Sequence, residues 1–440
     1  MGSEMCIRDS HNGQMDAFHK LALATCQANL EADGEPTPFK PFPAPDRSAG
    51  LTQRQVTARY GAPGSWFTDL DGYTIPLHMA IMPGGRRLPL LKSMLTTACE
   101  RDCLYCGFRA GCDPQRVTFG AEEMAQLYFG LHQRGIAHGL FLSSGIIGGG
   151  SRAQDRLLDT AEVLRRRLGY RGYLHLKIMP GAEQDQLTRA MQLADRVSIN
   201  LEAPSPPHLK RLAPHKRFDE ELLAPLRWAQ DVRRQLPPSS AWRGRWPSTT
   251  TQFVVGPAGE TDLDLLSLTT RLTRRLGLAR VYFEAFGPHP GTPLESQAPE
   301  DPLRAHRLYQ ASYLLRDYGF DLEELAFEPG GGLPRHVDPK IAYAQAALAG
   351  SPVEINRAPR EVLLRVPGIG PRTAETLLNA RRQRSLRDLD QLHRLGVIAE
   401  RAAPYITLDG HAPRRQLSLP WGCDARPDRW QSHLSGQEDQ

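Results

Sequence analysis

The amino-acid sequence predicts an α/β protein with a parallel sheet, followed by a small all-α domain. From about Leu88 onward, apolar segments alternate with amphipathic helical patterns. Strands that alternate with helices of about 10–15 residues imply right-handed βαβ units and hence a parallel sheet. After Pro352 the pattern changes: roughly 60 residues are mostly helical, rich in Arg and without strand signals. These two observations define the fold class and the change of domain.

The expected elements follow along the chain. Residues 15–30 carry a short helical pattern, and the Pro-rich residues 34–50 are expected to be irregular. Strands are expected at 90–96, 139–143, 172–178, 196–202, 249–255 and 280–286. Helices are expected at 121–134, 153–168, 183–194, 219–235, 262–276 and 302–318, with two shorter helical runs at 358–365 and 371–382.

Length and composition limit the domain organisation. The 440 residues allow two or three domains. We expect an N-terminal extension at 1–60, an α/β domain at 85–328, a linker at 329–351, a helical domain at 352–410 and a disordered tail at 411–440. No stretch approaches the roughly 18 apolar residues of a membrane span, and residues 1–30 lack the pattern of a secretory signal. The net charge of +5 does not by itself argue for nucleic acid.

Four of the seven cysteines fall within residues 99–112, a distribution typical of metal binding. We therefore expect a reducing, cytoplasmic location. Cys99, Cys103 and Cys106 have the spacing C-x3-C-x2-C. Three thiolates in one loop can face one cubane iron–sulfur cluster and leave its fourth iron open. A zinc site that includes Cys112 is an alternative, although C-x3-C-x2-C-x5-C is unusual for zinc. A loop without metal is the other.

The cysteine spacing resembles the signature of the radical S-adenosylmethionine (SAM) superfamily. The resemblance implies a [4Fe–4S] cluster held by Cys99, Cys103 and Cys106, with SAM bound to the fourth iron. It also implies reductive cleavage of SAM to a 5′-deoxyadenosyl radical, and a partial (βα)6 barrel, which agrees with the six expected units. In βα barrels the chemistry lies at the C-terminal ends of the strands, and the cysteine loop follows the end of the first strand.

The resemblance assigns further cofactor residues. Tyr105 occupies the usual aromatic position of the cluster loop, near the adenine of SAM. Ser143, Ser144 and Gly145 follow the second strand, where relatives carry a small Gly-containing motif that binds the amino group of SAM. A tight turn is the alternative for these three residues.

Polar residues also end the third and fourth strands. Lys177, Asn200 and Glu202 stand among apolar strand residues, where charged side chains are unfavourable unless they are paired or reach a cavity. They are candidates for binding SAM, Lys177 at its carboxylate and Glu202 at its ribose. The alternative is a structural ion pair between adjacent strands. Further along, Thr251, Gln252, Tyr282 and Glu284 are candidates for the substrate pocket.

The segment Val366–Ala374 resembles a helix–hairpin–helix motif. Gly368 and Gly370 permit a tight hairpin, and the following helix offers N–H groups and a positive dipole end to a phosphate. Ile369, Arg372 and Thr373 complete this candidate DNA-binding set, together with Gly396 in a weaker second copy at 392–397. Residues 352–410 hold ten Arg against seven acidic residues. A helical packing or protein-docking module is the alternative.

Taken together, residues 88–410 resemble a family of radical SAM proteins associated with DNA modification and repair that end in a helix–hairpin–helix domain. The likeness includes residues 141–147, 211–214 and 355–360. It implies that the chain grips the backbone of duplex DNA without reading sequence. It also implies a uracil-DNA-glycosylase-like protein as a partner, and an electron donor such as flavodoxin or ferredoxin. A radical SAM enzyme that modifies RNA such as tRNA, and a non-catalytic DNA-binding scaffold that recruits a glycosylase, are the alternatives.

Overall fold

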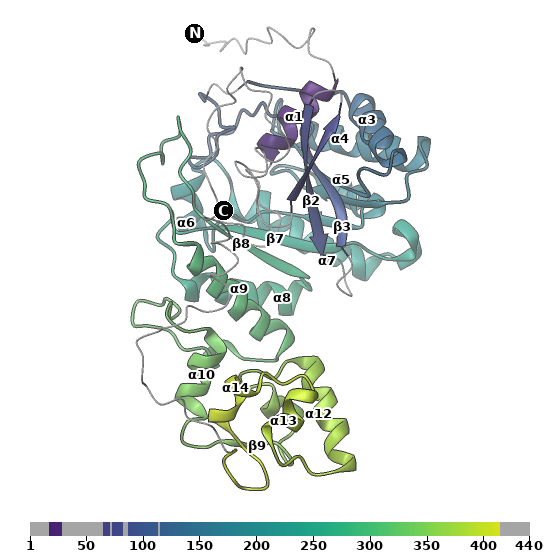
Figure 1. Ribbon diagram of the computed structural model, residues 1–440. Coiled ribbons are helices and arrows are strands. Elements are labelled where there is room, and N and C mark those ends of the chain that lie inside the picture. The colour runs from purple at the N-terminus through teal and green to yellow at the C-terminus, as the bar shows by residue number, and fades with distance from the viewer. Residues whose placement is uncertain (1–16, 29–64, 71–72, 82–86, 113–114, 414–440) are drawn as a thin grey trace, which may run out of the picture. The chain divides into compact units, whose positions relative to one another are not determined.

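The computed structural model describes residues 17–28, 65–70, 73–81, 87–112 and 115–413 (Figure 1). The chain divides between Tyr343 and Ala344 into two compact units. Most of the expected tail at 411–440 and most of the expected extension at 1–60 lie outside the described residues.

The first unit contains an eight-stranded sheet whose spatial order follows the sequence. Its strands are β1 (Ser65–Leu70), β2 (Tyr73–Ile81), β3 (Arg87–Met94), β4 (Gly139–Ser143), β5 (Tyr173–Lys177), β6 (Arg196–Ser198), β7 (Ser248–Val255) and β8 (Arg280–Ala285). Strands β3 to β8 pair in parallel, which confirms the six expected strands. The order ends at β8, so the described sheet is an open barrel. Figure 1 shows its curl, because β2 and β3 run steeply through the view while β7 and β8 cross it.

Helices alternate with these strands, and the six that the sequence predicts between 121 and 318 are confirmed, whereas the helix at 206–212 was not predicted. They are α3 (Ala121–Gln133), α4 (Gly150–Glu162), α5 (Gln184–Leu193), α6 (Pro206–Leu212), α7 (Ala224–Gln235), α8 (Asp262–Leu276), α9 (Pro302–Asp317) and α10 (Pro339–Ala347). A π-helical turn, η2 (Val163–Arg167), extends α4, and another, η3 (Phe218–Leu223), precedes α7. Short 3-10 turns are η4 (Pro238–Ser240), η5 (Trp242–Gly244) and η6 (Leu322–Glu324). Helix α8 illustrates the end signals: Thr261 accepts a hydrogen bond from the Asp264 amide at its start, and Gly277 ends it in the left-handed conformation.

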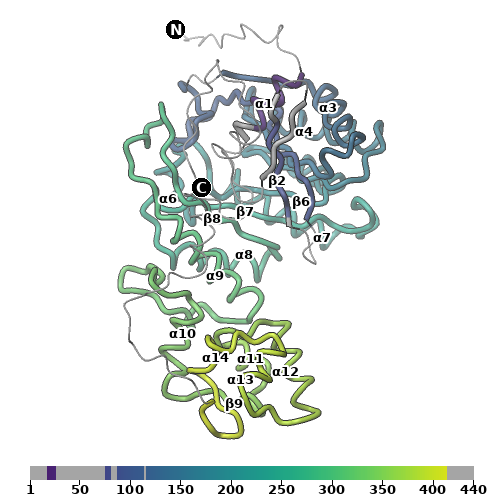
Figure 2. Tube along the Cα trace, viewed as in Figure 1, coloured from purple at the N-terminus to yellow at the C-terminus, as the bar shows by residue number. Residues whose placement is uncertain are grey.

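An antiparallel hairpin, β1–β2, extends the sheet before β3, and the sequence pattern did not predict it. Pro76 argues against a strand inside a sheet, because it lacks an N–H donor. Pro76 is tolerated because it pairs with Phe67 of β1 beyond the end of the β2–β3 ladder, which stops at His78. The predicted N-terminal helix is confirmed as α1 (Ala17–Ala28), which packs against β2 and β3 (Figure 2).

Polar residues line the inner face of the parallel strands. Lys177, Ser198 and Thr250 are aligned by the strand register, and all three are buried. His175 lies one alternation earlier on β5 and is also buried. Burial, followed by the positive charges of Arg196 and other nearby cations, lowers the pKa of His175 well below its usual value. The inside of this barrel is therefore suited to polar ligands.

Part of the expected linker belongs to the packing of the first unit. Leu333 is almost fully buried, and its amide donates to the carboxylate of Asp262 at 2.8 Å. Gly331 accepts from the amide of Leu263 at 3.0 Å. The Gly-rich turn therefore caps the start of α8.

The described residues of the second unit form the helices α11 (Arg360–Leu363), α12 (Pro371–Gln383), α13 (Leu389–Arg394) and α14 (Ala399–Ala402), with a 3-10 turn, η7 (Ala403–Tyr405), after them. The sequence predicts an all-α domain here, and that prediction is wrong in one respect. The strands β9 (Val353–Glu354) and β10 (Ile406–Thr407) form a parallel ladder. Glu354 secures this ladder by accepting from the Thr407 hydroxyl at 3.0 Å and the Gly410 amide at 2.8 Å. Two-residue strands give no periodic signal, which explains the error.

Across both units, the described helices include none that is long and apolar enough to cross a membrane.

Candidate functional site

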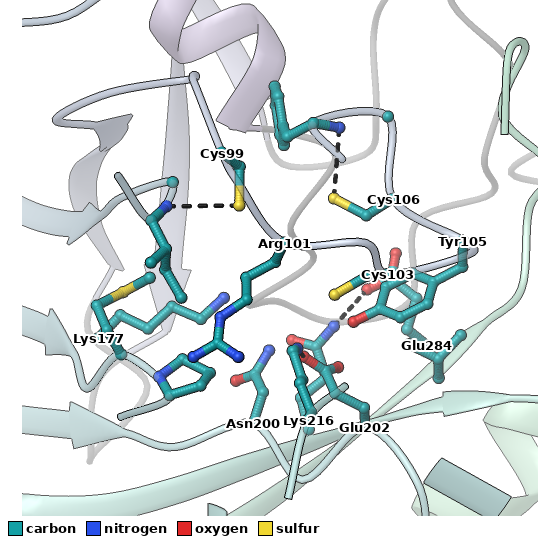
Figure 3. A pocket seen from close by; sticks show the side chains of 18 of the residues that line it. Cys99, Arg101, Cys103, Tyr105, Cys106, Lys177, Asn200, Glu202, Lys216 and Glu284 are labelled. Carbon is teal, nitrogen blue, oxygen red and sulfur yellow. Dashed lines mark hydrogen bonds and ion pairs between the residues drawn. The ribbon is translucent and has the colours of Figure 1, made fainter. Parts of the chain in front are cut away.

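A pocket opens at the C-terminal ends of the parallel strands of the first unit (Figure 3). Its walls come from the cysteine loop after β3, from the segments after β4, β5 and β6, and from β7 and β8. The space between these walls is continuous with solvent.

Cys99, Cys103 and Cys106 all line this pocket, and Figure 3 shows their sulfur atoms around one space. The Sγ atom of Cys99 accepts from the Ile146 amide at 3.4 Å, and that of Cys106 accepts from the Phe108 amide at 3.4 Å. Burial raises the pKa of the Cys103 thiol, and the positive charge of the nearby Lys216 ammonium partly offsets this by lowering it. Backbone N–H donors and one cation thus face sulfurs that would carry negative charge as metal ligands.

The turn after β4 lies against the cysteine loop, and it requires glycine. The amide of Gly145 donates to the Thr96 carbonyl at 2.7 Å, and the Glu100 amide donates to the Ile146 carbonyl at 2.7 Å. A Cβ atom at Gly145 would lie 2.0 Å from the carbonyl oxygen of Ala98. Ser144 and Gly145 line the pocket. Ser143 is fully buried within β4 and is not among the lining residues, so the structure separates it from its two predicted partners.

Glu202 lies at the centre of a buried polar cluster. Its backbone is left-handed, with φ of 64°, and its carboxylate accepts from Lys216 Nζ at 3.3 Å. Tyr105 contacts the same carboxylate, and burial followed by the negative charge of Glu202 raises the pKa of its phenol well above the usual value. For Lys216, burial alone would lower the pKa, but the negative charges of Cys103 and Glu202 raise it overall. This ion pair is not the one between adjacent strands that the sequence suggested.

Most of the remaining predicted residues meet at the same place. Lys177 and Asn200 line the pocket together with Glu202, and so do Gln252 and Glu284 from β7 and β8. Thr251 and Tyr282, the other two substrate-pocket candidates, are not among the lining residues. The amide nitrogen of Gln252 donates to the Glu284 carboxylate at 2.8 Å. Six of the seven predicted cofactor residues therefore surround the space that the three cysteines face.

Three charged or titratable pocket residues were missed by sequence reasoning: Arg101, Lys216 and His289. Arg101 donates to Glu221 at 2.7 Å, which ties the cysteine loop to η3. Lys216 lies two residues after the segment 211–214, which carried part of the family resemblance, and that position was the available signal. Burial lowers the pKa of His289.

The donor set fits an iron–sulfur cluster. Three thiols from one loop surround a pocket that contains backbone N–H donors and a cation, and hydrogen bonds to cluster sulfurs are a usual feature of such sites. Cys112, which a zinc site would add, instead donates to the Gly291 carbonyl at 3.0 Å and is not a lining residue. In the described part of the chain, no three His, Cys, Asp or Glu side chains converge as around a single ion.

In the second unit, two hairpins join the short helices and contact each other. Gly368, with φ of 82°, accepts from the Ile398 amide at 3.1 Å, and a Cβ atom there would lie 2.5 Å from the Ile398 carbonyl oxygen. The Thr373 hydroxyl donates to the Gly396 carbonyl at 3.3 Å. The structure thus places the two predicted glycine turns side by side, with Gly370 capping α12 and Arg372 exposed near its start. Ile369, by contrast, is buried and supports the turn from inside.

No family model matches this chain. Nor does any curated protein match it. Solved structures resemble part of it: the FeFe-hydrogenase maturase HydG from Carboxydothermus hydrogenoformans (14% identity, TM-score 0.41, 52% of this chain and 51% of the other), methylornithine synthase PylB (17%, 0.41, 53% and 64%), and coproporphyrinogen III oxidase HemN from Escherichia coli, described as a radical SAM enzyme (14%, 0.34, 52% and 52%). The chain spans less than two thirds of the length of each of these proteins. Likenesses this weak do not assign an activity, so the assignment depends on the site itself.

Proposed function

We propose that this protein is a radical SAM enzyme that modifies or repairs a base in DNA. The observation that carries the proposal is the convergence of Cys99, Cys103 and Cys106 on a pocket at the C-terminal ends of six parallel strands. The cysteines have the spacing of a three-cysteine cubane site, and they lie at the end of the barrel where βα-barrel enzymes place their catalytic residues.

The cluster and SAM, when bound, supply a 5′-deoxyadenosyl radical that abstracts hydrogen from a substrate or adds to it. The chain's own residues hold and orient these groups. Cys99, Cys103 and Cys106 would ligate iron, and Tyr105 would contact the adenine of SAM. Ser144 and Gly145 would bind the amino group of the methionine part of SAM.

The polar residues of the pocket complete the proposed cofactor site. Lys177 faces the SAM carboxylate, and Asn200 and Glu202 face the ribose. Lys216 holds the Glu202 carboxylate in place, since their side chains are only 8% and 7% exposed and a buried charge needs a partner.

Nucleic acid enters the proposal through the second unit, which we interpret as a paired helix–hairpin–helix domain. Support comes from the reciprocal contacts of the Gly368 and Gly396 turns, and from an exposed Arg372 at the start of a 13-residue helix. Such turns grip phosphates without reading bases. A base within a duplex must then be flipped out to reach the pocket. A uracil-DNA-glycosylase-like protein and a flavodoxin or ferredoxin remain the proposed partners.

The first experiment tests the chemistry. The protein is reconstituted anaerobically with iron and sulfide, supplied with SAM and dithionite, and assayed for 5′-deoxyadenosine. We expect product from the wild type and from Cys112→Ser, the matched control, and none from Cys103→Ser. A Cys103→Ser variant that forms product at the wild-type rate would refute the three-cysteine assignment.

The second experiment tests the partner. Binding to a DNA duplex and to a structured RNA is measured over a series of salt concentrations. We expect preference for DNA, and Arg372→Ala should lower the salt slope by about 1, as for the loss of one phosphate contact. Arg384→Ala, at the opposite end of α12, is the matched control. Tighter binding to RNA would favour an RNA-modifying enzyme instead.

A further inference from the structure

Two side chains of the pocket have no part in the cluster and SAM site proposed above: Gln252 on β7 and Glu284 on β8. The strand register pairs Gln252 with Tyr282 and Val254 with Glu284, so the two residues are diagonal neighbours on the inner face of the sheet. The Gln252 amide nitrogen donates to Glu284 Oε2 at 2.8 Å, and both residues line the pocket with the cysteines. They therefore form a fixed pair near the reaction space.

The carbonyl oxygen of this glutamine lacks a hydrogen-bond partner. Gln252 is 5% exposed, and its Oε1 atom is buried and accepts from no described residue. Exchanging the amide oxygen and nitrogen would not solve the problem, because the oxygen would then face the Glu284 carboxylate. A buried acceptor left unsatisfied destabilises a protein by about 1–3 kcal/mol. The arrangement is favourable if a ligand provides the missing donor.

The chemistry of the pair defines that ligand. A glutamine oxygen and a carboxylate are both acceptors, so together they select N–H donors over carbonyl oxygens. Among nucleobases, cytosine, adenine and guanine carry an exocyclic amino group, whereas uracil and thymine present carbonyls at the corresponding positions. Enzymes that act on flipped bases recognise them through hydrogen bonds to the Watson–Crick edge, which carries these groups.

We infer that Gln252 and Glu284 recognise the target base, and that they select a base with an exocyclic amino group. This inference rests on the proposed function, since it takes the pocket to receive a nucleobase. It goes beyond that function by naming the class of base and the residues that distinguish it.

The experiment compares 2′-deoxycytidine with 2′-deoxyuridine, which differ at one ring position by an amino group against a carbonyl. Binding to the reconstituted protein is measured by equilibrium dialysis with saturating SAM and without reductant, so that the SAM site is filled and no turnover occurs. We expect 2′-deoxycytidine to bind about tenfold more tightly or better, as for one good base contact. 2′-Deoxyguanosine and thymidine form the second pair, with the same expected direction.

Variants assign the preference to the pair. Glu284→Gln and Gln252→Leu should reduce the ratio of the two affinities to about one, because each removes an acceptor. Glu323→Gln changes the same functional group at an exposed position and should leave the ratio unchanged. Iron content and thermal unfolding show whether each variant is folded, and the wild-type ratio tests the inference even if a variant does not fold.

The two proposals fail in different ways. Equal affinities for 2′-deoxycytidine and 2′-deoxyuridine, or no binding of either at their solubility limits, would overturn the base-reading pair and indicate that water satisfies Gln252. Formation of 5′-deoxyadenosine would be unaffected by that result. Absence of 5′-deoxyadenosine alongside a clear amino preference would instead refute the radical chemistry and leave the recognition intact.

Discussion

Substitution of Gly145 by alanine should separate the cysteine loop from the turn that supports it. Gly145 does not have a positive φ, so the restriction is one of space rather than of backbone conformation. The added Cβ would lie 2.0 Å from the Ala98 carbonyl oxygen, 2.8 Å from its carbon and 3.2 Å from the Thr96 oxygen. Real Cβ contacts do not fall below 3.0 Å, so the two backbones must move apart by about 1 Å.

That movement has two consequences of known size. Overpacking of this kind typically lowers the free energy of unfolding by about 1–3 kcal/mol. Ala98 directly precedes Cys99, so the displacement reaches the first predicted cluster ligand. A misplacement of about 1 Å at a reacting centre can reduce the rate about 100-fold.

The assay follows both effects in Gly145→Ala: thermal unfolding of the apoprotein, and iron content with 5′-deoxyadenosine formation after reconstitution. Gly130→Ala is the matched control, because Gly130 lies within α3 and a Cβ there meets nothing within 4 Å. The control should be neutral or slightly stabilising, since alanine favours the helix by about 0.5–1 kcal/mol. A Gly145→Ala protein with wild-type stability, iron content and rate would refute the packing argument.

Three further predictions concern other parts of the molecule. Arg304→Met should lower the free energy of unfolding by about 3–5 kcal/mol, because it leaves the fully buried Asp262 and Glu260 carboxylates without their cation; a loss below about 1 kcal/mol in denaturant titration would contradict this. Because burial lowers the pKa of His175, the free energy of unfolding is highest above the unfolded pKa of about 6.5 and falls as the pH drops below that value. His175→Gln should reduce this fall by up to about 1.4 kcal/mol per pH unit. Equal slopes of unfolding free energy against pH in the two proteins would disprove the prediction. Gly368→Ala should weaken DNA binding at unchanged iron content, because both the left-handed backbone and the Ile398 carbonyl oppose a side chain; unchanged affinity in a gel-shift titration would exclude this turn from the interface.

The sequence predicts the parallel strands well, because each is a short apolar run bounded by helical patterns. β7 and β8, for example, lie within one residue of their expected limits. The prediction fails where the periodic signal is absent or contradicted. The hairpin before β3 contains Pro76, and β6 stops at Ser198, although the apolar pattern continues to Leu201. After Ser198 the regular ladder gives way to an isolated bridge between Glu202 and Phe253, and apolar periodicity carries no information about the left-handed backbone of Glu202.

Within the site, the cysteines were predictable because their ligand function depends on close spacing in one loop. The partners of the charged residues were not. Lys177 and Glu202 suggested an ion pair because both stand at the ends of neighbouring strands, but Glu202 bonds to Lys216, fourteen residues further on. Lys216 belongs to an irregular segment between α6 and η3, and no periodicity places such a residue in space.

Glu202 combines a left-handed backbone with a buried carboxylate. A non-glycine residue in the left-handed region costs about 1–3 kcal/mol and persists only where its surroundings over-determine it. Here the Glu202 amide donates to the Gln252 carbonyl at 2.9 Å, and its own carbonyl accepts from the Val254 amide at 2.9 Å. Both bonds tie the segment after β6 to β7, and the carboxylate meets Lys216 beside Cys103 in the pocket. Backbone strain and a buried charge therefore coincide at the residue that we propose to contact the ribose of SAM, and the contacts to β7 and Lys216 hold its carboxylate in the pocket.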